Sequence, residues 1–298
     1  MVLRPRCYPH LNHALLTKLM EARQGDVVRS RVFIVILLAG LLTSSNGSAG
    51  TPKKLLLIGQ GPDGHPPQTH EYMAGLKVLA KCLKPVPDLE VTTVRADGAW
   101  REGPDLLDRA DGVVLYLAEG ARWIDAQPDR RKAFERLAAR DGGLVALHWA
   151  IGTREAAPID RFLRLLGGCH GGPDRKYKVL EAEATVVDPG HEIARGISSF
   201  RVRDEFYYEL KLMKPSDGIQ PLLQVPIEGA KQTVCWAWER PQGGRSFGFS
   251  GLHFHDNWRL EPYRRLVSQG VLWTLKLPIP KDGMAVEVSE TDLRLPDR

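Results

Sequence analysis

Short uninterrupted apolar runs alternate with amphipathic helical patterns through the first half of the chain, and this alternation constrains the fold most. The runs lie at 54–59 (KLLLIG), 112–117 (GVVLYL) and 143–149 (GLVALHW), and helical spacing of apolar residues marks 70–83 and 129–140. A continuous apolar run of this length is typical of a parallel strand that helices bury on both faces. The pattern predicts an α/β fold with a doubly wound, mainly parallel sheet.

The rest of the chain extends this fold. A further strand is predicted at 89–94 and a further helix at 156–166. Strand-like segments then dominate, at 178–187, 206–212, 233–238 and 246–249, before a closing helix at 262–277. No long linker separates the two halves, so we expect one α/β domain at 50–280 with β-rich insertions in its second half, followed by a polar tail at 281–298.

The positive charge of the chain is concentrated at its beginning. The formal net charge is +5, and residues 1–49 contain six basic residues but only two acidic ones. The remainder, 50–298, is therefore almost neutral and has no basic run, which argues against a nucleic-acid partner. A neutral body favours a small, uncharged or weakly charged substrate such as a sugar.

Residues 1–49 are typical of an export signal. Arg29 and Arg31 precede the apolar run 32–42, and small residues follow as far as Ala49. Eleven helical residues cover roughly 16 Å, about half of a hydrocarbon core, so we expect cleavage near Ala49 and no stable membrane span. An uncleaved anchor is the alternative. Export predicts a periplasmic or extracellular location, and the three cysteines beyond this segment are too few for a disulfide framework.

Two histidine positions carry most of the chemical signal. His148 ends the strand at 143–149, at a strand-to-helix turn where neither Cys nor Ser offers a nucleophile, so a base, a metal ligand or a substrate donor is expected there. His253 and His255 follow the strand at 246–249 and, in extended chain, face the same side. With His148 or an acid as third ligand they predict a divalent metal site, for example for zinc; a metal-free hydrogen-bonding site or a structural pair are the alternatives.

Three other segments offer candidate groups. Asp204 and Glu205 stand beside Tyr207, a combination that suits acid–base work or sugar recognition but also a salt-bridged strand end. His170 lies in the glycine-rich segment 167–173, and His65 follows the first predicted strand. Neither glycine-rich segment has the spacing of a nucleotide-binding loop, so no nucleotide cofactor is expected.

Five short blocks in order resemble the ThuA-like, or trehalose utilization, family. They are GGLVALH at 142–148, LGG with His170 at 166–170, DPGHEI at 188–193, DEFYY at 204–208 and GLHFHDNW at 251–258. The resemblance implies a flavodoxin-like sheet related to class I glutamine amidotransferases, without their cysteine nucleophile, and a connection with sugar metabolism. The third block has Asp-Pro where His-Pro is usual, so a turn role is expected for His191.

These observations lead to one functional hypothesis and one alternative. The hypothesis is an exported enzyme that hydrolyses a glycoside or eliminates from an oxidised sugar; the alternative is a noncatalytic carbohydrate-binding or accessory protein. The predicted catalytic residues are His148, Glu205, His253 and His255, of which the three histidines are also the predicted metal ligands. The predicted substrate-binding residues are His65, His170, Asp204, Tyr207, Asp256, Asn257 and Trp258.

Overall fold

The first strand shows why the apolar runs become central strands. A computed structural model describes residues 51–296, and in it β1 (Lys53–Gly59) pairs in parallel with a strand on each side. Leu55 and Leu57 face one hydrophobic core, whereas Leu56 and Ile58 face a second core on the other side of the sheet. Because successive side chains point to opposite faces, a strand covered on both faces must be apolar throughout.

The main sheet has five parallel strands followed by four antiparallel ones. Its order is β2-β1-β3-β4-β12-β11-β10-β7-β8. The parallel strands besides β1 are β2 (Leu89–Arg95), β3 (Gly112–Tyr116), β4 (Gly143–Leu147) and β12 (Arg245–Phe249), and the antiparallel ones are β11 (Ala230–Glu239), β10 (Ile219–Ile227), β7 (Lys176–Val186) and β8 (Phe200–Tyr208). The parallel part has the flavodoxin-like arrangement, which confirms the predicted fold class.

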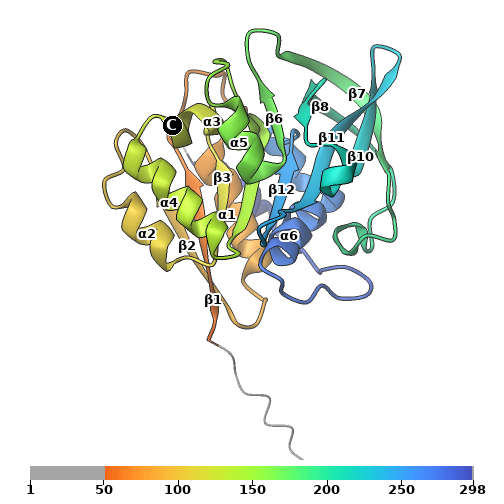
Figure 1. The fold of residues 1–298 in the computed structure, drawn as a ribbon. Coiled ribbons are helices and arrows are strands. Elements are labelled where there is room, and N and C mark those ends of the chain that lie inside the picture. The colour runs from red at the N-terminus through yellow and green to blue at the C-terminus, as the bar shows by residue number, and fades with distance from the viewer. Residues whose placement is uncertain (1–50, 297–298) are drawn as a thin grey trace, which may run out of the picture. The chain divides into compact units, whose positions relative to one another are not determined.

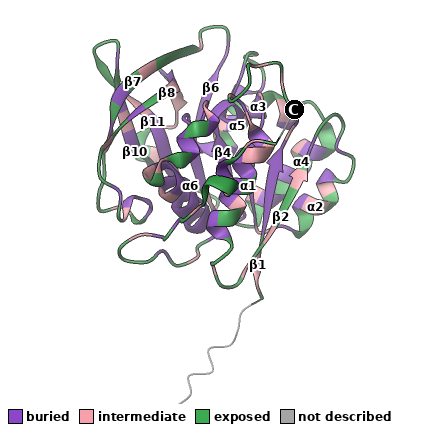
Figure 2. Ribbon diagram, turned by 180° about the vertical axis from the view of Figure 1, so that it is seen from behind, coloured by how far each residue is buried: buried purple, intermediate pink, exposed green. Residues whose placement is uncertain are grey.

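Helices cover both faces of the parallel strands (Figures 1 and 2). On one face α1 (Tyr72–Leu83) and α6 (Glu261–Thr274) contribute to the core that contains Leu57. On the other face lie α2 (Gly103–Arg109), α3 (Gly120–Asp125), α4 (Pro128–Ala139) and α5 (Ile159–Leu166). The described helices include none that is long and apolar enough to cross a membrane.

The β7–β8 hairpin leaves the plane of the main sheet. Strand β7 pairs with β10 only through Thr185 and Val186, while β7 and β8 pair with each other along nearly their whole length. The far end of the hairpin is thereby free to reach the carboxyl ends of the parallel strands, where Tyr207 contacts His148. A small sheet of β5 (Gly152–Thr153), β6 (Gly168–Gly171) and β9 (Lys211–Leu212) lies at the same end.

Several local predictions can be compared with this structure. The glycine-rich segment 167–173 contains β6, and a Cβ on Gly168 would lie 2.5 Å from the Trp236 ring, so glycine there permits a close approach of the backbone to that ring. His191 accepts a hydrogen bond from the Ile193 backbone and has the predicted turn role. The three cysteines in the described part of the chain are buried and free.

Two predicted segments need correction. The strand predicted at 206–212 starts earlier, because β8 runs from Phe200 to Tyr208. The polar tail predicted at 281–298 is not free up to residue 296: Met284, Val286 and Leu293 are buried in the core beside α1 and α6, and the segment includes α7 (Glu290–Leu293). The predicted leader at 1–49 lies outside the described residues.

Candidate metal centre

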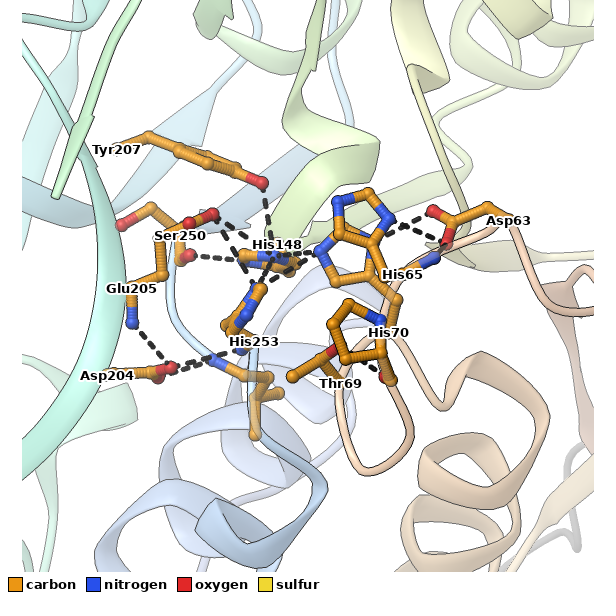
Figure 3. A network of polar contacts seen from close by, with 12 residues as sticks. Asp63, His65, Thr69, His70, His148, Asp204, Glu205, Tyr207, Ser250 and His253 are labelled. Carbon is orange, nitrogen blue, oxygen red and sulfur yellow. Dashed lines mark hydrogen bonds and ion pairs between the residues drawn. The ribbon is translucent and has the colours of Figure 1, made fainter. Parts of the chain in front are cut away.

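Three imidazole rings meet where three parallel strands end (Figure 3). His70 follows β1, His148 follows β4 and His253 follows β12. The Nε2 atoms of His70 and His148 are 3.0 Å apart, and the Nδ1 atom of His253 lies 3.1 Å from the first and 3.2 Å from the second. The carboxyl ends of parallel strands are where α/β folds place their ligands, and the sheet brings these distant residues together there.

The outward-facing nitrogens fix the protonation of two of the rings. His70 Nδ1 lies 2.8 Å from a carboxylate oxygen of Asp63, and His148 Nδ1 lies 2.9 Å from the backbone oxygen of Ser250. Both oxygens can only accept a hydrogen bond, so each Nδ1 carries the proton and each Nε2 presents a lone pair. Two lone pairs therefore face each other, which is unfavourable unless a cation or a proton lies between them.

The donor set fits a divalent transition metal. Three imidazole nitrogens at about 2.0–2.1 Å from a tetrahedral zinc ion are roughly 3.3 Å from one another. The observed separations of 3.0–3.2 Å are close to this value. Hydrogen bonds from the second nitrogen of a ligand histidine to a carboxylate or a backbone oxygen are also typical of metal sites. His70, His148 and His253 would hold the metal.

Backbone strain accompanies this arrangement. His70 and His148 have φ angles of 53° and 49°, and Leu252, which precedes His253, has a φ of 77°. Non-glycine residues in this left-handed region cost of order 1–3 kcal/mol each and concentrate at functional sites. The positive φ of His148 turns the chain sharply from β4 into a 3₁₀ turn at His148–Ile151, so that its ring projects toward the other two.

Glu205 and Tyr207 approach the three rings from β8. Oε1 of Glu205 lies 3.6 Å from His253 Nδ1 and 3.9 Å from His148 Nε2, and the four candidate ligand atoms lie within 4.8 Å of one another. The Tyr207 hydroxyl donates to His148 Nε2 at 3.0 Å. Glu205 can thus serve as a fourth ligand or act on a molecule in the fourth position.

Asp204 lies beneath the centre and holds the His253 loop. Its carboxylate is fully buried and accepts hydrogen bonds from the backbone nitrogens of Leu252 and His253 and from the Tyr263 hydroxyl. Burial raises its pKa to about 6, against the lowering effect of these donors. Asp204 is therefore a positioning residue, and it does not line the cavity in which a substrate would lie.

Electrostatics keep the rings neutral and the nearby carboxyl weakly acidic. Burial lowers the pKa of His70 and of His148, and lowers that of His253 to about 3; the neighbouring imidazoles add to the lowering. Burial, followed by the charge of Asp204, raises the pKa of Glu205 to about 7. Neutral imidazoles are the form that binds metal, and a carboxyl with a pKa near neutrality can both accept and donate a proton.

A cavity of about 110 Å³ opens onto the centre. Its lining consists of His65, His70, Trp149, Arg154, His170, Arg175, Tyr177, Glu205 and Tyr207. Tyr207 stacks on His170, with ring centroids 4.0 Å apart, and His65 stacks on His70 at 3.6 Å. The cavity is smaller than pockets for drug-sized ligands, so it admits a small molecule or one end of a larger one.

A family model described as ThuA, trehalose utilisation, matches residues 61–274. This match covers His70, His148, Glu205 and His253, the four residues of the candidate centre. The chain belongs to the ThuA family.

Solved structures agree with this assignment at the level of fold. A ThuA-like protein from Bacteroides uniformis ATCC 8492 is 14% identical with a TM-score of 0.59, and the match covers 76% of this chain and 93% of that one. A ThuA-like protein from Parabacteroides merdae ATCC 43184 is 16% identical with a TM-score of 0.58, covering 82% and 100%. A search of curated proteins finds no match to this sequence.

Part of the predicted ThuA-family site lies elsewhere. His255 does not join His253: its Nε2 donates to the Leu293 backbone oxygen, because a 3₁₀ turn at His255–Arg259 ends the extended geometry on which the prediction depends. Asp256 is exposed and pairs with Arg259. Asn257 donates to the Arg203 backbone oxygen, and Trp258 is a core residue against Tyr116. These four residues do not line the cavity.

Apart from Asp204, the remaining predicted residues lie at the centre or along its cavity, and two important ones were not predicted. His148, Glu205 and His253 converge, and His65, His170 and Tyr207 line the cavity. The sequence prediction misses His70 and its partner Asp63. His70 stands at the beginning of a predicted helix, but it also follows the first strand, at the same sheet edge as His148. That shared position is the signal that identifies it.

Proposed function

We propose that this ThuA-family protein is a metal-dependent enzyme that acts on a sugar or sugar derivative. The observation that carries the proposal is the triangle of imidazole nitrogens of His70, His148 and His253, with sides of 3.0–3.2 Å. The family description, trehalose utilisation, supports a carbohydrate substrate. A divalent metal held by these residues would act as a Lewis acid that polarises a sugar oxygen or activates water.

The chain's own residues divide the remaining work. Glu205 lies beside the open side of the triangle and borders the cavity, so it is the group that accepts a proton from, or returns one to, a substrate oxygen or carbon. Trp149 offers an aromatic wall for a sugar ring. Elimination from an oxidised sugar can use this pairing of an electrophile with an acid–base group, and so can hydrolysis of a glycoside by an activated water.

Export remains part of the proposal. It rests on the signal-like segment 29–49 in the sequence. Expression of the full chain in a bacterium, followed by fractionation and determination of the N-terminus, tests it. Mature protein that begins near residue 50 in the periplasm or medium supports export, and an intact chain in the cytoplasm contradicts it.

Metal content and turnover test the catalytic proposal together. We expect purified 50–298, after incubation with zinc, to retain about one ion per chain and to convert at least one member of a panel of glycosides and oxidised sugars. His253→Ala removes both properties. Asp256→Asn is the matched control, because Asp256 lies three residues from His253 but is exposed and outside the centre, and it keeps both.

Three results discriminate between the possibilities. Wild-type protein that retains no metal contradicts the metal centre. Unchanged activity in His253→Ala contradicts the assigned site. Saturable sugar binding without turnover across the panel favours a noncatalytic carbohydrate-binding or accessory protein.

A further inference from the structure

Two arginines border the same cavity as the candidate centre. Arg154 and Arg175 are part of its lining, together with Trp149 and His170. The lining contains one carboxyl group, that of Glu205, and it lies at the candidate metal centre with its pKa raised to about 7. It therefore does not neutralise the two arginines. The lining of the cavity therefore has more arginines than carboxylates, although the chain beyond residue 49 is almost neutral overall.

Arg154 is held in a fixed position. The buried carboxylate of Glu119 accepts hydrogen bonds from both the backbone nitrogen and the guanidinium of Arg154. The guanidinium also lies over the Trp149 ring, 5.4 Å from its centroid. Glu119 thereby compensates the charge of Arg154 and fixes its direction beside the aromatic wall.

Arg175 differs because its charge is not compensated by a carboxylate. Its contact to the Gly172 backbone oxygen is long, at 3.5 Å, and no ion pair to Arg175 occurs within residues 51–296. The neighbouring Asp174 carboxylate pairs with Lys211 instead. The charge of Arg175 reaches the cavity, since after burial it is the main effect that lowers the pKa of His170.

We propose that the substrate carries an oxyanion, a carboxylate or a phosphate, which Arg175 binds with Arg154 beside it while the sugar ring lies against Trp149. This inference rests on the proposed function and narrows its substrate class to anionic sugars. A guanidinium matches the planar geometry of such oxyanions and forms paired, charge-assisted hydrogen bonds with them. The almost neutral composition of residues 50–298 does not indicate these two arginines at the cavity.

Calorimetric titration tests the inference without requiring turnover. Zinc-loaded protein is titrated with glucuronate, glucose 6-phosphate and glucose, so that the first two distinguish a carboxylate from a phosphate. We expect at least one anionic sugar to bind roughly ten- to a hundredfold more tightly than glucose. Arg175→Gln removes this preference and leaves the affinity for glucose and the zinc content unchanged.

A matched control and defined outcomes complete the test. Arg136→Gln removes an arginine that pairs with Asp108 on the outside of α4, away from the cavity lining, and keeps the preference. Equal binding of all three sugars, binding of none at millimolar concentration, or a preference that survives Arg175→Gln overturns the inference. Loss of metal or turnover with an intact, Arg175-dependent preference contradicts the proposed function alone and leaves the anion site supported.

Discussion

The Nε2 atoms of His70 and His148 lie 3.0 Å apart, although Asp63 and the Ser250 carbonyl make both of them acceptors. A pair of facing lone pairs at this distance is unfavourable unless a cation or a proton lies between them. The distance between these two acceptor nitrogens therefore favours a cationic ligand, which the presence of histidines alone would not indicate. It also predicts that residues outside the triangle affect how tightly the triangle binds a metal.

Asp63 is the first test of that dependence. Burial raises its pKa, but hydrogen bonds from His70 and Tyr72 outweigh this effect and keep the carboxylate ionised. Asp63→Asn presents an amide that can donate to His70 Nδ1 and shift the ring proton to Nε2. We expect zinc affinity, measured by chelator competition, to fall about 10–100-fold. Asp256→Asn, at an exposed carboxylate, is the control; equal affinities in the two variants refute the tautomer argument.

Tyr207 competes with a metal for the same lone pair. Its hydroxyl donates to His148 Nε2, and this hydrogen bond must break when the nitrogen binds a cation. Tyr207→Phe removes the competing donor and keeps the ring that stacks on His170. We expect zinc to bind a few-fold more tightly, because a neutral hydrogen bond contributes about 1 kcal/mol. Weaker zinc binding in the same titration would mean that the hydroxyl supports the centre instead.

The sequence predicts this fold well because its parallel strands are buried on both faces. The run KLLLIG at 54–59 leaves few alternatives to a central strand. The position of His148 follows from the end of another such run, at 143–149. The order of strands across the sheet cannot be predicted from the sequence of any single segment. For that reason the sequence indicates that His148 and His253 are important without pairing them with His70.

The errors have a local physical cause. The pairing of His253 with His255 assumes extended backbone, but the 3₁₀ turn that begins at His255 rotates its ring toward Leu293. Glu205 is predicted as a candidate from its neighbours, yet its distance to the rings depends on how the β7–β8 hairpin leaves the sheet. Such turns and departures are set by tertiary packing, which a short sequence window does not contain.

His170 gives a prediction about acid stability. Burial lowers its pKa from the ordinary 6.5 to about 3, so between these values the unfolded chain binds a proton that the folded chain does not. The contribution of neutral His170 to the free energy of unfolding is complete above pH 6.5. It falls by about 1.4 kcal/mol per pH unit as the pH is lowered from there. His170→Phe removes this dependence and the unpartnered Nε2 atom. Urea unfolding of both proteins across this range should show that the free energy of unfolding falls more steeply toward acid pH in the wild type than in the variant. Parallel curves contradict the assignment.

The segment after residue 280 gives the last prediction. If it were a free polar tail, removing residues 281–298 would leave stability unchanged. In the structure Met284, Val286 and Leu293 are buried, the Val286 oxygen accepts from Arg264, and the Leu293 oxygen accepts from His255. Burial of each side chain contributes roughly 1.5–3 kcal/mol, so we expect the truncated chain to lose about 5 kcal/mol or more.

Thermal unfolding compares this truncated chain with one that lacks only residues 1–49, and Val286→Ala provides a milder variant that still folds. A buried valine that loses two methyl groups costs about 1–3 kcal/mol and lowers the melting temperature by several degrees. Because His255 donates to the Leu293 oxygen and begins the turn after His253, the truncation also loosens the loop that carries a candidate ligand. Zinc affinity should therefore fall together with stability. An unchanged melting temperature would mean that residues 281–298 do not stabilise the domain.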